Sequence, residues 1–229
     1  MTEIILKKPQ FLAAASLFAS KDRCRYYLNG VLIEPDPLGG VFLVATDGHR
    51  MVVFRDPEGM TDKPHILPVS KHLFNACKFS AKAGERELIA DGDLIHLYEK
   101  QNEDEPDARI DVSIYCEIDG SFPDWRRVFQ SIKVGMQGVS DSVNHTLLAA
   151  FSSMIKAAYG TRADTLPVRL VQFGPEPMLI LHEQRDWFGL LMPLRSKQIE
   201  SNHLPFEIGV DIDPDTKQAS NQKPAIAAA

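Results

Sequence analysis

Lysines are the residues of this chain whose spacing most directly suggests chemistry, because they gather in stretches without acids. Residues 63–84 contain four lysines and neither aspartate nor glutamate, and residues 144–162 contain Lys156 and Arg162 and again no acid. Lys71, Lys78 and Lys82 are separated by seven and four residues, which predicts one face of a helix. Such a face can contact nucleic-acid phosphate without sequence preference, although the net charge is −6. The alternative, that each lysine only solvates a helix surface, stays open.

No group of residues has the spacing of a catalytic or metal centre. The chain contains no G-x-S-x-G, P-loop or H-E-x-x-H motif, and its seven histidines do not cluster at ligand spacings. Paired acids such as Asp91 and Asp93 fall in turns, where solvated surface is the ordinary role. The Gly39-Gly40 pair opens no helix, which favours a plain turn over a phosphate cradle. We therefore expect no enzyme activity, no cofactor and no metal.

Three amphipathic segments are available to position the lysines. They begin at Pro9, at Ser70 and near Asn144, about 60–75 residues apart. Proline suits the first turn of a helix, and serine is a good N-cap. In the second segment the apolar residues recur at helical spacing as far as Ala81. The three segments therefore predict three helices that share one phase.

Strand-like segments flank each predicted helix. One precedes each helix, at residues 3–6, 65–69 and 134–139. Three follow each helix, at residues 26–34, 40–46 and 51–54, then 87–90, 94–99 and 110–117, then 168–173, 178–182 and 187–192. Tight turns are expected at Asp47-Gly48, Asp91-Gly92 and Gly174-Pro175. The pattern is βαβββ, repeated about three times, which predicts an α+β fold with helices on one face and antiparallel sheets on the other.

Composition places the chain among globular cytoplasmic proteins. Its 229 residues are 44% hydrophobic and 24% charged, with no apolar run long enough to span a membrane and no signal peptide. The three cysteines, Cys24, Cys77 and Cys116, lack C-x-x-C spacing, which favours reduced thiols over a disulfide framework or a zinc site.

Four short strings carry a resemblance to a known family. They are Arg25-Tyr-Tyr-Leu-Asn-Gly30, Ala45-Thr-Asp-Gly-His-Arg-Met51, Phe122-Pro-Asp-Trp-Arg-Arg-Val128 and Leu190-Leu-Met-Pro-Leu-Arg195. In type and order they resemble the signature segments of the bacterial β sliding clamp, the processivity subunit of DNA polymerase III. The chain departs from the family pattern at Trp125, where tyrosine is usual, and at Leu194, where methionine is usual.

The resemblance implies a clamp fold and a division of the chain. Two βαβββ units make one domain in that family, so residues 1–129 would form a complete domain similar to the family's middle domain. Residues 130–195 would form one further unit, similar to the last half of the third domain. Residues 196–229 extend past the usual end of the family chain. Residues 206–212 alternate apolar and polar positions, which predicts an extra edge strand, and residues 214–229 have the composition of a disordered tail.

The resemblance also implies a pocket for a short peptide bearing a glutamine and a leucine/phenylalanine pair, as carried by polymerases and clamp loaders. The residues that match the family's pocket are Leu28, Thr46, Gly48, His49, Arg50, Met51, Pro123, Arg127, Val128, Leu190, Leu191, Met192, Pro193 and Leu194. The types fit, because leucine, methionine and valine form an adaptable apolar surface and arginines can donate to a peptide. The alternative is that these strings only maintain the fold.

Two functions follow as hypotheses. The first is a sliding clamp that encircles or contacts duplex DNA through Lys71, Lys78, Lys82 and Lys156, and binds polymerase and clamp-loader peptides. The family ring contains twelve βαβββ units, so three per chain would close a homo-oligomeric ring with four subunits. The second is an adaptor or decoy that binds replisome peptides without forming a ring. No membrane partner is expected.

Overall fold

The computed structural model describes residues 3–101, 107–130, 143–160, 167–171 and 177–194. All of them lie in the first of two compact units, which covers residues 1–194. The predicted strand at 134–139, the Gly174-Pro175 turn and the extension 196–229 with its strand at 206–212 lie outside the described residues. The predicted boundary between residues 129 and 130 falls within the first unit and stays a prediction.

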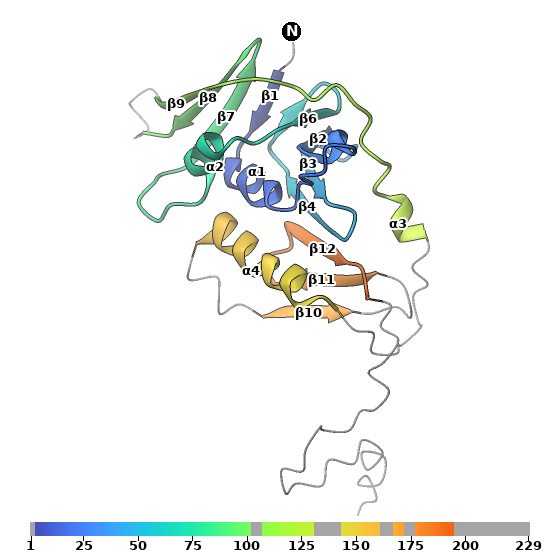
Figure 1. Cartoon of the computed structure of the whole chain (residues 1–229). Helices are drawn as coiled ribbons and strands as arrows, with labels where there is room; N and C mark the ends of the chain where they lie inside the picture. Colours follow the sequence, from blue (N-terminus) through green and yellow to red (C-terminus); the bar gives the residue numbers. More distant parts are fainter. Residues whose placement is uncertain (1–2, 102–106, 131–142, 161–166, 172–176, 195–229) are drawn as a thin grey trace, which may run out of the picture. The chain divides into compact units, whose positions relative to one another are not determined.

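The helices and strands follow the predicted order (Figure 1). The first repeat comprises β1 (Glu3–Leu6), α1 (Pro9–Ser16), the 3-10 turn η1 (Tyr26–Leu28), β2 (Val31–Pro35), β3 (Val41–Thr46), β4 (Arg50–Asp56) and the short β5 (Met60–Thr61). The second comprises β6 (His65–Leu67), α2 (Lys71–Cys77), β7 (Arg86–Asp91), β8 (Leu94–Glu99), β9 (Ala108–Ile114) and the short helix α3 (Arg127–Gln130). The third comprises α4 (His145–Tyr159), β10 (Val168–Val171), β11 (Met178–His182) and β12 (Trp187–Leu191). A helix followed by three strands is thus confirmed in each repeat, and the initial strand in the first two.

Two antiparallel sheets connect the repeats. One has the strand order β5-β1-β7-β8-β9, and the other has the order β10-β11-β12-β4-β3-β2-β6. The first strand of each of the first two repeats joins the sheet of the other repeat, because β1 pairs with β7 and β6 pairs with β2. The third repeat joins the first through β12, which runs antiparallel to β4. The repeats are therefore interlocked by backbone hydrogen bonds.

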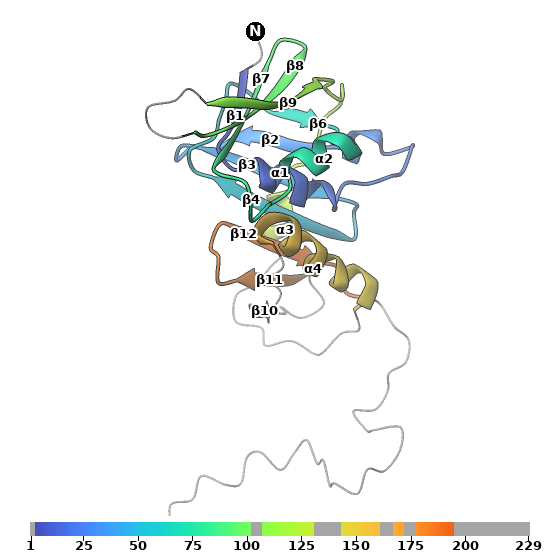
Figure 2. The ribbon, with the colours of Figure 1, turned by 90° about the vertical axis from the view of Figure 1, so that its left-hand side faces the viewer.

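The helices lie on one side of the strands, as Figure 2 shows with α1, α2 and α4 in front of the sheets. α1 packs against both α2 and α4. Almost all of α1 is buried, including Phe11 and Leu12, and the main core fills the space between the helices and the inner faces of both sheets. Burying one leucine or phenylalanine side chain stabilises the fold by about 1.5–3 kcal/mol. This shared core therefore holds the repeats together in addition to the backbone hydrogen bonds of the sheets. The predicted α+β arrangement is confirmed.

α2 is shorter than predicted. It begins as expected with Ser70 as N-cap, whose Oγ accepts a hydrogen bond from the Leu73 N–H at 3.1 Å. It ends at Cys77, because Lys78 adopts an extended conformation with ψ 151° and the next N–H, of Phe79, donates to the Ala157 carbonyl at 2.8 Å. A contact with α4 thus replaces the last helical turn, and Lys82 does not lie on a helix.

The strand predicted at residues 26–34, the first after the first helix, begins later than predicted. Residues 26–28 form η1, in which the Leu28 N–H donates to the Arg25 carbonyl at 2.9 Å and the Asn29 N–H donates to the Tyr26 carbonyl at 2.9 Å. β2 then starts at Val31.

A second apolar cluster lies on the outer face of the seven-stranded sheet. The segment 115–130, called here the linker segment, runs across this face, and the Ile118 N–H donates to the Ile66 carbonyl at 2.9 Å. We call the group beneath it the outer cluster; its buried members are Leu32, Val44, Met51, Val53, Ile66, Trp125 and Leu190, with Phe122, Val128, Phe129 and Phe188 among the partly buried ones. The linker segment therefore covers one face of this sheet while the helices cover the other.

All three cysteines are free, as predicted. Cys77 is buried, and its burial raises the pKa of the thiol to about 12, whereas Cys24 and Cys116 are exposed. Among the described helices, none has the length and apolarity that crossing a membrane requires.

Candidate functional site

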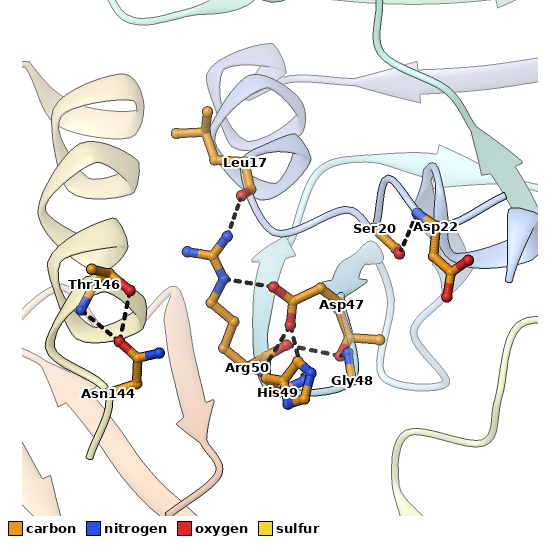
Figure 3. Close-up of polar contacts among 10 residues, drawn as sticks. Leu17, Ser20, Asp22, Asp47, Gly48, His49, Arg50, Asn144 and Thr146 are labelled. Atoms are coloured by element: carbon orange, nitrogen blue, oxygen red, sulfur yellow. Dashed lines mark hydrogen bonds and ion pairs between the residues drawn. The ribbon is translucent and has the colours of Figure 1, made fainter. Parts of the chain in front are cut away.

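The turn between β3 and β4 is fixed by its own side chains (Figure 3). The Thr46 hydroxyl donates to the Arg50 carbonyl at 2.8 Å and accepts from the Gly48 N–H at 3.0 Å. Asp47 Oδ1 accepts from the N–H groups of His49 and Arg50 at 2.9 and 3.0 Å. Gly48 has φ +88°, a conformation that glycine adopts without strain. The turn therefore presents His49 and Gly48, both exposed, on a rigid frame.

Arg50 is bound within the chain rather than free to meet a ligand. Its Nε donates to Asp47 Oδ2 at 3.0 Å (Figure 3). Its Nη2 donates at 3.1 Å to the carbonyl of Leu17, which lies at the end of α1. The guanidinium carbon also lies 4.7 Å from the centre of the Phe18 ring. Arg50 therefore ties the turn to α1, and only part of its donor capacity is left for a peptide.

The end of β12 lies against this turn. Leu190 is opposite Met51 in the ladder and Leu191 is opposite Arg50. One residue further, the Met192 N–H donates to the His49 carbonyl at 2.8 Å. The ladder thus places the segment that begins at Met192 directly beside the turn, across a gap of some 140 residues in the sequence.

The apolar residues at and after the end of β12 include both buried and exposed side chains. Leu190 belongs to the outer cluster, while Leu191 has no exposed surface and belongs to the main core. Met192 and Leu194 are 45% and 48% exposed. The expectation that Leu191 contacts a peptide is therefore wrong: successive strand residues point to opposite faces, and Leu191 points to the helices. Leu28 is likewise buried, and its carbonyl accepts from the Ser20 N–H at 2.8 Å, so its role is structural.

The linker segment brings the third predicted string to the same face. Val128 is partly buried in the outer cluster with Leu190 and Met51, while Pro123 and Arg127 are exposed. The anchor of this segment is Trp125, which is 8% exposed and whose Nε1 donates to Glu34 Oε1 at 3.0 Å.

Arg126 closes over this anchor. Its guanidinium carbon lies 4.2 Å from the centre of the Trp125 ring, and it forms an ion pair with Glu34 at 2.6 Å. From the sequence, Trp125 stands out only as a departure from the family pattern, and Phe129 does not stand out. The spacing of Phe122, Trp125 and Phe129, which recurs every three to four residues, was the available signal.

A cavity of about 410 Å³ lies beneath the linker segment. Its walls include Glu34, Glu117, Phe122 and Trp125, and Pro123 is the predicted site residue that lines it. Both carboxylates are already engaged, Glu34 by Trp125 and Arg126, and Glu117 by a contact of 3.1 Å between its Oε1 and His65 Nδ1. The cavity is therefore a neighbour of the predicted peptide site rather than the site itself.

A polar contact helps fix the third repeat against the first. Lys8, just before α1, lies 3.7 Å from Asp186, and the Tyr159 hydroxyl at the end of α4 donates to the same carboxylate. Burial and the hydrogen bond to Asp186 raise the pKa of Tyr159 far above its usual range, so the hydroxyl remains a donor. This contact, together with the β4–β12 ladder, positions Met192 relative to the turn.

The predicted basic residues are exposed, but they do not share one helix. Lys71 opens α2, Lys78 follows its last residue, and Lys82 lies in the turn beyond it, so the predicted helical face is wrong for Lys82. Lys78 Nζ donates to Asn75 Oδ1 at 3.1 Å. Lys156 lies on the last turn of α4.

Lys78 and Lys156 lie on segments that meet. Their chain neighbours, Phe79 and Ala157, are joined by the backbone hydrogen bond of 2.8 Å that ends α2. The structure therefore brings Lys78 and Lys156 to one junction of the helix layer. Lys71 lies at the other end of α2.

Comparisons with known proteins agree with this architecture. No family model matches the chain, and no curated protein matches it in sequence. Among solved structures, it is similar to a DNA polymerase sliding clamp from Pseudomonas aeruginosa, with a TM-score of 0.57 and 16% identity over 85% of this chain and 66% of that one. A DnaN sliding clamp, DNA polymerase III subunit beta, from Bartonella birtlesii gives a TM-score of 0.55 and 18% identity over 85% of this chain and 66% of that one. The β subunit from Streptococcus pyogenes gives 0.52 and 16% over 84% and 65%.

These identities are too low to carry over residue roles, and the chain spans about two thirds of the length of the solved clamps named above. They do agree with the repeated βαβββ order, the helix layer and the two antiparallel sheets described above. The chain has the fold of the bacterial DNA polymerase III β sliding clamps.

Proposed function

We propose that the protein is a non-enzymatic, clamp-like processivity factor that holds replication proteins on duplex DNA. The observation that carries the proposal is the junction of Met192 with His49. There an exposed apolar segment, a rigid turn and the linker segment come together on a clamp fold.

The peptide site would combine a fixed floor with an adaptable rim. Met51 and Leu190 are buried in the outer cluster and would support the site from beneath, while the partly buried Val128 would supply apolar surface. Met192 and Leu194 are about half exposed and could close on a leucine or phenylalanine of a bound peptide. Arg127, exposed on α3, is the better candidate to donate to the peptide glutamine, because Arg50 is bound to Asp47 and Leu17.

The DNA contacts would come from the helix layer. Lys71 is exposed on α2, Lys78 directly after α2, and Lys156 on α4. Phosphate contacts from such residues carry no sequence preference. We propose a homo-oligomeric ring of four chains, because three repeats per chain would supply the twelve repeats of the family ring, and a cytoplasmic location. Lys82 remains a candidate contact from its turn.

The test combines a fluorescent Gln-x-x-Leu-x-Phe peptide with circular and linear DNA. A clamp binds the peptide and co-elutes with nicked circular DNA after loading, but is lost when the circle is linearised. Peptide binding without retention on the circle would favour the adaptor or decoy function. Absence of peptide binding would refute the proposed site.

A further inference from the structure

The cavity of about 410 Å³ beneath the linker segment combines an apolar floor with an excess of acids. Leu32 on β2 and Ile66 on β6 line it from the sheet. Its ionisable lining residues are three carboxylates and one guanidinium, those of Glu34, Glu117, Asp124 and Arg126. Ligand pockets usually measure about 300–1,000 Å³, so the space is large enough for a side chain. The lining suits a ligand that is apolar along its length and positively charged at its end.

Two of the three carboxylates keep an oxygen available to a ligand. Glu34 makes both of its contacts through Oε1, with Trp125 Nε1 at 3.0 Å and the Arg126 guanidinium at 2.6 Å. Asp124 accepts the Arg126 N–H at 3.2 Å through Oδ1. Within the described part of the chain, Glu34 Oε2 and Asp124 Oδ2 are therefore left as acceptors. Glu117 differs, because both of its oxygens are held within the chain.

The cavity meets solvent on the outer side of the linker segment. Its lining residues Ser121, Pro123 and Asp124 are exposed, whereas Trp125 is 8% exposed. The Glu34 side chain is 14% exposed. A cation that entered past Asp124 would thus reach a carboxylate that is largely shielded from water, where charges attract more strongly than at the surface.

The strand order sets the distance between this cavity and the proposed peptide site. The peptide site lies where β12 meets β4, and the cavity floor lies on β2 and β6, in the order β12-β4-β3-β2-β6. Neighbouring strands are about 4.8 Å apart, so two to three strand spacings separate the two places by about 10–15 Å. An extended peptide rises about 3.3 Å per residue and covers that distance in about three to five residues.

We propose that the cavity binds the side chain of a lysine or arginine that lies about three to five residues from the glutamine, leucine and phenylalanine motif of a docked peptide. The aliphatic stem packs on Leu32 and Ile66, and the charged end donates to Glu34 Oε2 and Asp124 Oδ2. Arg126 leaves this place open, because its guanidinium stacks on Trp125. The inference rests on the proposed peptide site and names the partners that the site prefers.

Peptide affinity tests the spacing. A Gln-x-x-Leu-x-Phe peptide with lysine beyond a spacer of about four residues, at either end, is compared with its norleucine analogue by fluorescence anisotropy. At one end, lysine should raise the affinity about tenfold, as a hydrogen bond to a charged group does. Lysine placed directly beside the motif is the control, because it gives the peptide the same net charge. An equal gain at both positions, or no gain at either end, overturns the proposal.

Two isosteric variants test the contact itself. Glu34→Gln keeps the acceptor for Trp125, and Asp124→Asn keeps the acceptor for the Arg126 N–H, so each removes only a charge. Each should reduce the gain from lysine to about threefold, and the double variant should abolish it, with affinity for the norleucine peptide unchanged. Glu58→Gln is the matched control, because Glu58 is exposed in the loop between β4 and β5. A full gain in the double variant refutes this site.

A second measurement separates the cavity from the proposed peptide site. Fluorine NMR with 5-fluorotryptophan reports on the chain's two tryptophans, Trp125 and Trp187, and Trp125→Phe assigns the signals. A short lysine peptide without the motif should shift the Trp125 signal at about millimolar concentration, and its norleucine analogue should not. That shift in a chain that does not bind the motif refutes only the peptide site. Motif binding that lysine does not improve, without the shift, refutes only the cavity.

Discussion

At the scale of single residues, the exposure of a side chain decides which residues of the apolar segment Leu190–Leu194 can be substituted to test peptide binding. Met192 is 45% exposed beside the turn, whereas Leu191 is fully buried in the main core. Replacing Leu191 by aspartate would put a charge among leucines and phenylalanines and unfold the third repeat. Met192 is therefore the position where a charge reports on binding alone.

We expect Met192→Asp to weaken binding of the Gln-x-x-Leu-x-Phe peptide by at least a hundredfold. Peptide docking would bury an unpaired carboxylate, which costs several kcal/mol. Fluorescence anisotropy measures the affinity, and the melting temperature should stay within about 2 °C of the parent. Leu38→Asp is the matched control, since Leu38 is exposed in the loop between β2 and β3. Equal affinity in parent and Met192→Asp would place the peptide elsewhere.

His182 gives the third repeat a pH dependence. Burial lowers the pKa of its ring below the ordinary value, outweighing the opposing effects of Asp186 and Glu183, and the ring stacks on Trp187 at 5.3 Å. A lowered folded-state pKa means that the neutral ring is the stable form. The stabilisation is thus complete above about pH 6.5, the unfolded value, and is lost as pH falls toward the folded one.

We accordingly expect the melting temperature to fall between pH 7.5 and pH 5, and His182→Phe to reduce that fall. Phenylalanine keeps the stacking but cannot be protonated, so part of the acid sensitivity should disappear. Calorimetry at the two pH values measures the difference. An unchanged acid sensitivity in His182→Phe would show that other groups cause it.

At the scale of elements, the packing of α4 on β12 depends on a glycine. A methyl group at Gly189 would lie 2.2 Å from Phe151 Cε1, far inside van der Waals contact. Gly189→Ala should therefore destabilise the protein by about 1–3 kcal/mol, the usual cost of overpacking a core. Denaturant unfolding measures the loss. Phe151→Leu in the same chain makes room for the methyl group, so the double variant should lose less than the sum of the two single variants.

The sequence predicted the elements well where their cause is local. Ser70 and Asn144 act as N-caps, and Pro9 opens α1, because capping depends on residues within one turn. The end of α2 could not be predicted in this way. The N–H of Phe79 bonds to the carbonyl of Ala157, nearly eighty residues away, and that partner is invisible to helical periodicity.

In the candidate site, too, features with a local cause could be predicted and features that depend on distant residues could not. The Thr46–Met51 turn follows from its Asp-Gly pair and its side-chain hydrogen bonds, and its position beside Met192 agrees with the resemblance. The inward direction of Leu191 follows from strand alternation, but a matched motif does not separate inner from outer residues. The bonds from Arg50 to Asp47 and Leu17 depend on how α1 lies against the turn, so its reduced donor capacity became evident only in three dimensions.

At the scale of the whole molecule, the helix layer is the surface proposed to contact DNA. We expect the triple variant Lys71→Glu, Lys78→Glu and Lys156→Glu to lose retention on nicked circular DNA. Each single change to alanine should lower the slope of log affinity against log salt by about one unit. Lysine-to-arginine variants keep the charge and should behave like the parent.

Lys63→Glu serves as the control for a single charge reversal, because Lys63 is exposed in the segment between β5 and β6. Retention of the triple variant at parent levels, measured by gel filtration with the circle, would mean that these helices do not contact DNA. The adaptor function would then be favoured.

The ladder between β4 and β12 has a consequence for how the protein is made. β4 ends at Asp56, but the residues that pair with it, Trp187–Leu191, leave the ribosome more than a hundred residues later. At roughly 5–20 residues per second of synthesis, the edge of β4 waits several seconds or longer without its partner. During that time Val52 and Phe54 belong to an open strand edge, the kind of surface that recruits other chains. Synthesis speed and chaperone access are therefore expected to affect the yield of folded protein more than its final stability does.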